Sequence, residues 1–439
     1  MRGTTLDRRS LLKGSVAAAA ALLSAEELFN MASAWAQTAP WKPEAGAKLN
    51  ILRWKRFVEA EDQAFVAMVN AFGKATGTEM NVSNESYEDV QPKASVAANT
   101  GQGLDMVWGL YSLPHLFPEK CLDMSDVANY LGGKYGGWAP SAEAYGKSAG
   151  KWICTPVAVT GALINYRISS AEKAGFKEFP KDTGSFLELC KGLKRNNTPA
   201  GMALGHASGD ANTWLHWALW TFGGNLIDKD NKVVINSPET AKALEYVKQL
   251  YENFIQGTAS WNDSSNNKAF LAGELHCTVN GISIYVTAKR EKPEIAADMN
   301  HAYMPIGPIG KPTELHLAFP ILTFAFTKYP QACKAFAAFM QEAPNFNPWI
   351  QAAQGYLSPF LSAYDANPIW TADPKTTPYR DVAKRTLTPA GQGTLGEKAA
   401  TAIGDFIVVD MFANYCTGRE DIKGTIALAE RAAKRVYRS

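Results

Sequence analysis

The sequence lacks the spacings that usually identify a metal site or a catalytic centre. Its six histidines never occur as H-x-H, H-x-x-x-H or H-E-x-x-H, which argues against a zinc site. No G-x-S-x-G nucleophile elbow is present, because residues 205–209 read G-H-A-S-G and place the serine one position late. Residues 391–396 fit G-x-G-x-x-G, but no apolar strand precedes them, so they predict a loop before a helix. We therefore expect no metal, no cofactor and no catalytic residue.

An excess of charge of one sign is also lacking. The 439 residues include 44 Lys and Arg against 42 Asp and Glu, so the formal net charge is +2. Without a basic excess to neutralise phosphates, the chain is not expected to bind nucleic acid. What is present is an ordinary globular composition, 46% hydrophobic and 20% charged, that is rich in Trp (12) and Tyr (16). Aromatic rings in this number suit both a core and a cleft that stacks a ligand against flat surfaces.

The amino terminus carries an export pattern. Residues 8–13 read R-R-S-L-L-K, an alanine-rich apolar stretch follows at 16–23, and residues 34–36 (A-W-A) form a small-x-small cleavage motif. These features predict a twin-arginine (Tat) signal peptide over residues 1–36, cleaved near Ala36, and passage through the Tat translocase to the periplasm. The apolar stretch is shorter than the roughly 20 residues that span a bilayer. The alternative is an amphipathic first helix of the folded domain, but Glu26 and Glu27 interrupt its apolar face.

The six cysteines all lie after residue 36, and none is spaced as C-x-x-C, which argues against a metal knuckle or a redox motif. An oxidising periplasm would permit disulfides. A chain that the Tat route exports already folded has met only the reducing cytoplasm, so we expect buried free thiols and leave one disulfide open as an alternative.

Strand and helix patterns alternate after a leader segment at residues 37–47. We expect a strand at 49–54, a helix at 61–72, a second strand at 80–83, a helix at 90–99 and a buried strand at 105–108. Further on, Gly223 and Gly224 close a helix over 213–222, and Ser237 caps a helix with Pro238 at its first position. Pro320 weakens an apolar run at 319–326 as a central strand. This alternation predicts an α/β fold with a largely parallel sheet.

Five blocks in order resemble the family 1 extracellular solute-binding proteins of ABC importers, the maltose-binding-protein-like group. They are residues 103–107 (G-x-x-P-D-V in the family), 155–167 (a crossing segment ending Y-N-K), 222–241 (G-G-x-x-x-D, then N-S-P-E-A), 268–281 (A-F-x-x-G) and 305–308 (P-x-P-x-G). Four features depart from the pattern: Asn165 and Tyr166 are reversed, Gly307 and Pro308 are exchanged, no Trp closes the fourth block, and residues 274–276 (E-L-H) replace the usual small residues. The missing Trp and the replacement of small residues at 274–276 fall near the family's cleft, so the ligand need not be a common oligosaccharide.

The resemblance implies a type II-like periplasmic-binding-protein fold, in which two hinge-linked α/β lobes hold a ligand in the cleft between them. Crossings would fall near residues 155–159, 304–310 and 355. The first lobe would comprise residues 48–155 and 305–352, and the second lobe 156–304 and 353–439. Such a clamp closes by a hinge motion, and an ABC importer permease would recognise the closed form. The implied protein is a monomeric periplasmic binding protein that captures a carbohydrate or polyol without transforming it.

The candidate ligand-binding residues are those that the family places at the cleft and whose chemistry suits a polyol. Hydroxyl groups need paired donors and acceptors, because each buried orphan costs about 1–3 kcal/mol, and C–H faces suit aromatic rings. The candidates are Trp54, Trp108, Tyr111, Thr160, Asn212, Trp214, Asn280, Ser283, Tyr356 and Trp370.

Most of these candidates have a structural alternative. The tryptophans could equally be core residues, and we assign Trp217 and Trp220 to the packed face of their helix. Asn280 and Gly281 could form only a turn. Arg56, at the end of the first strand, is expected to be a solvated surface charge.

Two other functions stay open. The same fold could bind a charged small molecule, such as a polyamine, a phosphorylated polyol or an organic acid, because the Trp of the fourth block is missing. The chain could instead be an exported enzyme such as a glycoside hydrolase, since carboxylates that are distant in sequence can meet in space.

Overall fold

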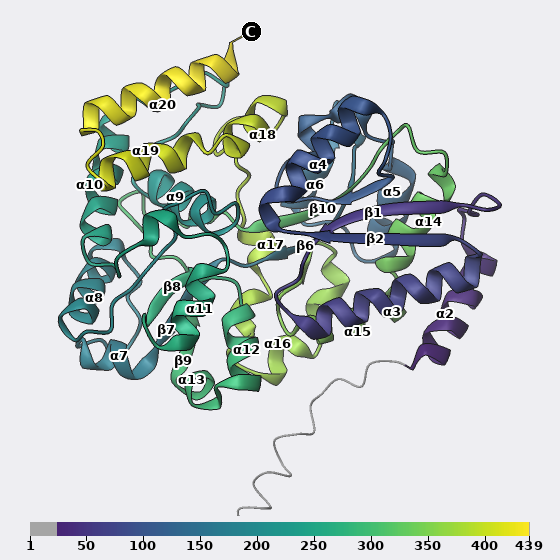
Figure 1. The fold of residues 1–439 in the computed structure, drawn as a ribbon, viewed down its shortest axis with the longest axis horizontal. Coiled ribbons are helices and arrows are strands. Elements are labelled where there is room, and N and C mark those ends of the chain that lie inside the picture. Colours follow the sequence, from purple (N-terminus) through teal and green to yellow (C-terminus); the bar gives the residue numbers. More distant parts are fainter. Residues whose placement is uncertain (1–23, 439) are drawn as a thin grey trace, which may run out of the picture.

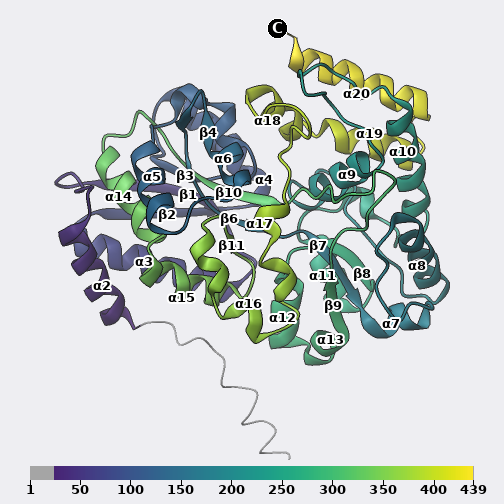
Figure 2. The ribbon, with the colours of Figure 1, turned by 180° about the vertical axis from the view of Figure 1, so that it is seen from behind.

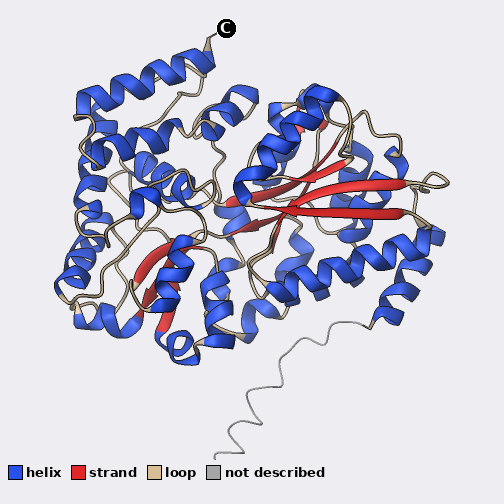
Figure 3. Cartoon of the chain, in the orientation of Figure 1, coloured by secondary structure: helices blue, strands red, loops and turns tan. Residues whose placement is uncertain are grey.

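The computed structural model describes residues 24–438, which form two lobes (Figure 1, Figure 3). The predicted twin-arginine motif at residues 8–13 lies outside the described residues. Helix α2 (Ala25–Thr38) begins with a capping box, in which the Ser24 hydroxyl accepts from the Glu27 amide and the Glu27 carboxylate accepts from the Ser24 amide. The predicted cleavage motif at 34–36 lies toward the end of this helix, where Trp35 packs on Phe339 with 5.2 Å between ring centroids.

The first lobe contains a six-stranded sheet of order β11-β6-β10-β3-β1-β2. Its strands are β1 (Lys48–Trp54), β2 (Glu79–Glu85), β3 (Met106–Trp108), β6 (Thr155–Thr160), β10 (Leu317–Thr323) and β11 (Ser358–Pro359). β1 pairs parallel with β2 and β3, whereas the β10–β3, β10–β6 and β11–β6 pairs are antiparallel. Strands β10 and β11 therefore run against the others, and the sheet is mixed rather than largely parallel, because β10 returns to this sheet from the second lobe.

Pro320 lies inside β10, which is a central strand between β6 and β3. Proline cannot donate a ladder hydrogen bond, and the register with β6 shifts between Phe319 and Pro320. This local irregularity explains why a residue that argues against a central strand is tolerated there.

Helices pack on both sides of this sheet. Figure 1 shows α4 and α6 on one side and α3 and α15 on the other. The core between them is aromatic: Trp108 packs against Phe65 of α3 and Trp349 of α15, with ring centroids 5.4 Å and 5.2 Å apart. The helices of the lobe are α3 (Glu59–Thr76), α4 (Tyr87–Thr100), α5 (Ser125–Lys134), α6 (Pro140–Gly146), α14 (Pro330–Met340) and α15 (Ala343–Ala353), with short 3-10 turns η1 (Leu113–Leu116) and η2 (Pro118–Lys120) and a small hairpin of β4 (Lys147–Ser148) and β5 (Lys151–Trp152).

The second lobe is mostly helical around a three-stranded antiparallel sheet of order β8-β7-β9. Its strands are β7 (Leu163–Arg167), β8 (Cys277–Asn280) and β9 (Met299–Ala302), and its helices are α7 (Ile168–Lys173), α8 (Thr183–Arg195), α9 (Asp210–Thr221), α10 (Pro238–Tyr251), α11 (Ser265–Ala272), α12 (Ser283–Glu291), α13 (Pro293–Asp298), α18 (Glu397–Gly404), α19 (Ile407–Cys416) and α20 (Ile422–Tyr437). The predicted start of α10 is confirmed, because the Ser237 hydroxyl accepts from the Thr240 amide and Pro238 opens the helix.

The first and third crossings between the two sheets differ from the expected positions, whereas the second includes the expected residues 304–310. All of β6 belongs to the first lobe, so the first crossing is Gly161-Ala162, just before β7. The second runs from the end of β9 to the start of β10, over residues 303–316. β11 pairs with β6, so the chain near residue 355 returns to the first sheet instead of leaving it. We propose that the third crossing follows α17 (Val382–Arg385), which lies with α16 (Ile369–Ala372) between the lobes in Figure 2.

The crossings meet at a largely buried group of polar residues, which we call the hinge cluster: Glu314, His316 and Arg385. Arg385 donates two hydrogen bonds to the Glu314 carboxylate, at 2.8 Å and 2.6 Å, and His316 Nε2 lies 3.1 Å from the same group. His316 Nδ1 accepts from the amide of Ala162 in the first crossing, at 3.1 Å. One side-chain group thus connects the first and second crossings with the end of α17.

Residues 397–416 are long and apolar enough to resemble a membrane-spanning helix by composition. The structure divides them into α18 and α19 at Phe406, whose backbone is left-handed (φ 55°), and 56% of the stretch is buried in the protein. This stretch therefore packs into the core of the second lobe. The six cysteines are free and five of them are buried, which confirms the expectation of unpaired thiols.

Candidate ligand-binding cleft

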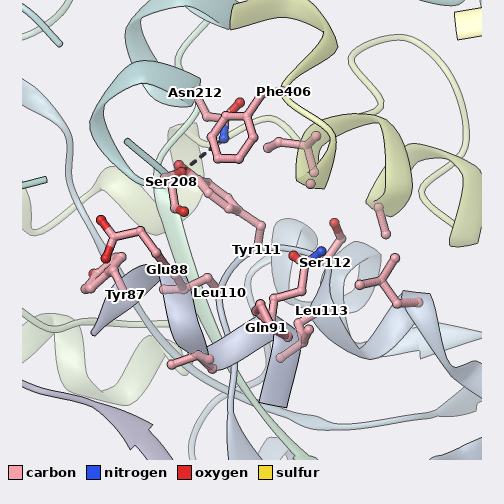
Figure 4. Close-up of a pocket in the computed structure, with 16 residues that line it drawn as sticks. Tyr87, Glu88, Gln91, Leu110, Tyr111, Ser112, Leu113, Ser208, Asn212 and Phe406 are labelled. Carbon is pink, nitrogen blue, oxygen red and sulfur yellow. Dashed lines mark hydrogen bonds between the residues drawn. The ribbon is translucent and has the colours of Figure 1, made fainter. Parts of the chain in front are cut away.

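A cavity of about 170 Å³ lies between the two lobes (Figure 4). The first lobe contributes the face of α4, including Tyr87, Glu88 and Gln91, and the loop after β3. The second lobe contributes Ser208 and Asn212 beside the start of α9, and Phe406 between α18 and α19. Because both lobes line the cavity, a change in their relative orientation would open or close it.

The loop after β3 reaches across this cavity. Tyr111 has a left-handed backbone (φ 48°), which is uncommon for a residue other than glycine. Its hydroxyl donates to the carbonyl of Gly209 in the second lobe, at 3.0 Å. The two lobes are therefore in direct contact at the cavity.

A second, smaller cavity of about 20 Å³ is lined from both lobes by Phe57, Tyr87, Thr160, Leu317 and Tyr356 together with Asp210, Asp263, Asn280, Gly281 and Ser283. Tyr87 lines both cavities. The close approach at this point needs a glycine, since a Cβ on Gly281 would lie 2.8 Å from the Thr160 methyl group. We refer to the two cavities together as the cleft.

The start of α9 supplies polar groups to the cleft. Asp263 accepts from the backbone amides of Gly209 and Asp210, at 3.0 Å and 2.7 Å, so it caps this helix from a distant loop. Asn212 donates to the Ser208 carbonyl at 3.1 Å, as Figure 4 shows, while its own Oδ1 is buried without a hydrogen-bond partner. An unpaired buried acceptor beside a cavity is suited to a hydroxyl or amine of a ligand.

Acidic side chains dominate the charge of the cleft. Burial raises the pKa of Asp210 well above its usual range, and the neighbouring Asp263 raises it further, although a hydrogen bond from Asn266 opposes both effects. Burial raises the pKa of Asp263 to about 6, against the lowering effect of the amides that it caps. Glu88 lines the larger cavity, and among residues 24–438 no Lys or Arg lines either one.

Six of the predicted ligand-binding residues line the cleft. Tyr111 and Asn212 line the larger cavity, and Thr160, Asn280, Ser283 and Tyr356 line the smaller one. Thr160 also donates to the Tyr356 carbonyl, and Asn280 to Asn267. These six come from crossings, turns and helix starts, where the resemblance to the binding-protein family was most informative.

Contrary to the prediction, the four tryptophans proposed as ligand-binding residues are core residues. Trp54 and Trp108 lie inside the first lobe with their rings 6.0 Å apart. Trp214 is buried in the second lobe and donates to the Ala203 carbonyl at 2.6 Å, and Trp370 donates to the Tyr364 carbonyl at 3.1 Å. Their large apolar rings are stabilised more by close packing than by a partly wet cleft.

Arg56 was predicted to be a solvated surface charge, but it is buried. Its guanidinium lies over the Trp54 ring at 4.0 Å and donates to Glu61, which also binds Arg53. The position of this ion group under the aromatic core explains why a charged residue at the end of a strand does not reach solvent.

Several cleft residues were not predicted: Phe57, Tyr87, Glu88, Gln91, Asp210, Asp263, Leu317 and Phe406. Asp210 lies two residues before Asn212 and three before the predicted helix at 213–222, so its position near a helix start was a signal that the sequence offered. Asp263 lies in a polar loop without periodicity, and no local pattern indicates that it caps α9.

The two-lobed α/β arrangement is the fold of periplasmic binding proteins, as solved structures show. They include maltose-bound MalE3 of T. maritima (TM-score 0.77, 16% identity, 89% of this chain and all of that one) and the GacH receptor of Streptomyces glaucescens, solved unliganded and with acarbose (TM-score 0.75, 18% identity, 90% of this chain and all of that one). A ribitol complex of a solute-binding protein from Agrobacterium radiobacter K84 has a TM-score of 0.72 at 16% identity, over 89% of this chain and 99% of that one.

The chain belongs to the family of bacterial extracellular solute-binding proteins, whose model matches residues 67–378. It is 24% identical over 298 residues to the Escherichia coli K12 protein YcjN, whose name assigns it to the ABC transporter periplasmic-binding proteins, and this covers 64% of this chain and 66% of the relative. It is 21% identical to a Deinococcus radiodurans protein that is named as an ABC transporter-binding protein, over 52% of this chain and 54% of that one. The chain thus aligns with less than two thirds of the length of each relative. The family is defined by solute binding and not by catalysis.

Proposed function

We propose that this protein is the substrate-binding component of an ABC importer, and that it captures a carbohydrate or polyol by closing its two lobes. The observation that supports this most is a cleft whose walls come from both lobes and which combines aromatic rings with hydrogen-bonding side chains. The curated relatives are named for ABC transporters, and similar folds were solved with maltose, acarbose and ribitol.

The cleft has the two kinds of surface that a polyhydroxylated molecule needs. The rings of Tyr87 and Phe406 offer flat apolar faces for C–H groups. Asn280, Ser283 and the unpaired Oδ1 of Asn212 offer acceptors and donors for hydroxyl groups. A ligand that bonded to groups on both lobes would stabilise the closed form over the open one, which is the condition for capture.

The proposal is tested by calorimetric titration of the purified protein with a panel of sugars and polyols, with melting temperature as a second measurement. We expect one ligand per protein, no product release and a raised melting temperature, since a ligand stabilises the folded state by RT ln(1 + [L]/Kd). Replacing Asn212 by Ala should weaken binding about tenfold, because one buried hydrogen bond is lost. Asn99→Ala, at the end of α4 and outside the cleft, is the matched control. Turnover of a sugar substrate in excess would contradict the proposal.

A charged small molecule is the second candidate ligand. The acidic residues that line the cleft indicate which sign of charge it would carry. A phosphorylated polyol or an organic acid would bring negative charge toward Asp210, Asp263 and Glu88 without a lining Lys or Arg to offset it. Within this class, the cleft favours a cation.

A further inference from the structure

We propose that the ligand carries a protonated amine besides its hydroxyl groups, and that Asp210 and Asp263 form the counter-charge for this amine inside the cleft. This inference rests on the proposed function and narrows its substrate class to amino sugars and amino polyols.

The first support is the hydrogen bonding of the two carboxylates, which line the same cavity and are each only 6% exposed. Asp263 is occupied by the amides of Gly209 and Asp210. Asp210 accepts from Asn266 through Oδ2 at 2.6 Å, whereas its Oδ1 accepts no hydrogen bond from any described residue. A nearly buried carboxylate with an open acceptor beside a cavity is ready to bind a donor from a ligand.

The second support is the missing positive charge. Two buried carboxylates without a cationic partner are costly to ionise, and an ammonium group at hydrogen-bond distance removes much of that cost. Arg56 lies 5.7 Å from the Tyr356 ring, but it is held in a two-point contact with Glu61. Among the described residues that line the cleft, none supplies the counter-charge.

The third support is the set of neighbouring groups that suit an ammonium group. The rings of Phe57, Tyr87 and Tyr356 line the same cavity as the two carboxylates, and a cation is attracted to the face of an aromatic ring. The unpaired Oδ1 of Asn212, two residues after Asp210, is a further acceptor for an N–H or O–H donor. A neutral polyol would use the acceptors but leave the charge of the carboxylates unbalanced.

Binding of an amine should also release protons. Burial raises the pKa of both aspartates, and the titratable groups that face them are Glu88, Tyr87 and Tyr111. An ammonium ion stabilises the ionised carboxylates, so a proton that the pair holds in the free protein leaves when the cation binds. A neutral ligand has no such effect.

The experiment compares ligands that differ in one group: glucose with glucosamine, and sorbitol with 1-amino-1-deoxysorbitol, with N-acetylglucosamine as the uncharged control. Calorimetry at pH 6 to 7 in two buffers of different ionisation enthalpy gives both affinity and proton release. We expect each amine to bind about tenfold tighter than its neutral partner, with proton release only for the amines. Asp210→Asn should abolish the preference, whereas Asp410→Asn, an exposed acid outside the cleft, should preserve it.

The outcomes separate the two proposals. Equal or tighter binding of the neutral partners, or a preference that survives in a folded Asp210→Asn protein, would overturn the amine and leave sugar capture intact. Proton release in the wild-type protein decides the question even if the variant does not fold. If no member of the two pairs binds, and no other sugar or polyol does, both proposals fail.

Discussion

Glu61 lies between two guanidinium groups in the core of the first lobe. Its carboxylate accepts from Arg56 at 2.7 Å and from Arg53 at 3.2 Å, and the Trp349 indole donates to it at 2.8 Å. Although burial opposes ionisation, the charges of Arg56 and Arg53 hold the pKa of Glu61 below its ordinary value of 4.5. Asp62 adds a partly exposed second counter-charge to Arg53 at 3.4 Å, but only the Glu61 carboxylate contacts both guanidinium groups among the described residues.

Replacing Glu61 by Gln should lower the free energy of unfolding by about 3–5 kcal/mol, because Arg56 stays buried without a counter-ion and Arg53 keeps only the carboxylate of Asp62, 3.4 Å away. Since the folded pKa is lowered, the wild-type contribution is present above pH 4.5 and is lost as the pH falls below it. Urea unfolding at pH 7 and pH 4 measures both effects.

The control for this prediction is Glu59→Gln, at the exposed start of the same helix, where Glu59 pairs with Arg290 on the surface. It should change stability by less than about 1 kcal/mol. A similar loss in both variants would mean that the cost comes from the helix start and not from the buried charges.

At the scale of elements, the hinge cluster decides how the two lobes are held. Glu314 binds Arg385 and His316, and His316 accepts from the Ala162 amide, so the cluster joins segments that belong to different crossings. The backbone adds a further connection, since the Leu387 amide donates to the Glu314 carbonyl at 2.8 Å. Such a group restricts the φ and ψ changes that a hinge needs.

Replacing Glu314 by Gln should loosen this hinge, because the double hydrogen bond from Arg385 loses its charge. We expect a larger radius of gyration of the ligand-free protein in small-angle X-ray scattering and a weaker apparent affinity, as more of the population is open. Arg380→Gln removes a nearby exposed pair with Asp381 and serves as the control. An unchanged radius of gyration in Glu314→Gln would show that the cluster supports folding without setting the angle between the lobes.

At the scale of the whole molecule, the fold could be predicted well from the sequence. The strand at 49–54, the helix over 61–72 and the capped start of α10 correspond to β1, α3 and α10, because period and capping are local signals. The direction of β10 and the return of β11 to the first sheet were not predictable, since they depend on pairing between segments that are far apart in the sequence.

The cleft was predicted in part, and the reason differs between residue types. Thr160, Asn280 and Ser283 line the smaller cavity, and they were predicted because the resemblance places the ends of particular segments at the cleft; their contact with a ligand stays a prediction. Trp54, Trp108, Trp214 and Trp370 were misplaced, because a ring at the end of a strand or the start of a helix can point into either the core or the cleft. Asp263 was missed because only the tertiary structure brings its loop to α9.

Export of the whole chain is a further proposal, since the predicted signal motif lies outside the described residues. We propose Tat-dependent export, cleavage near Ala36 and a monomeric mature protein in the periplasm. Mass analysis of the periplasmic fraction should show an amino terminus at Gln37, and exchange of both Arg8 and Arg9 for Lys should keep the precursor in the cytoplasm. A periplasmic protein that retains α2 would contradict the cleavage site, and export of the double variant would contradict the Tat route.

The burial of the tryptophans has a practical consequence. The indole rings of Trp54, Trp108, Trp214 and Trp370 are packed in the two lobes, and no tryptophan lines either cavity of the cleft. Intrinsic emission will therefore come mainly from rings that a guest molecule never touches. If tryptophan emission stays unchanged while a compound is titrated into this protein, that result is not evidence that the compound fails to bind.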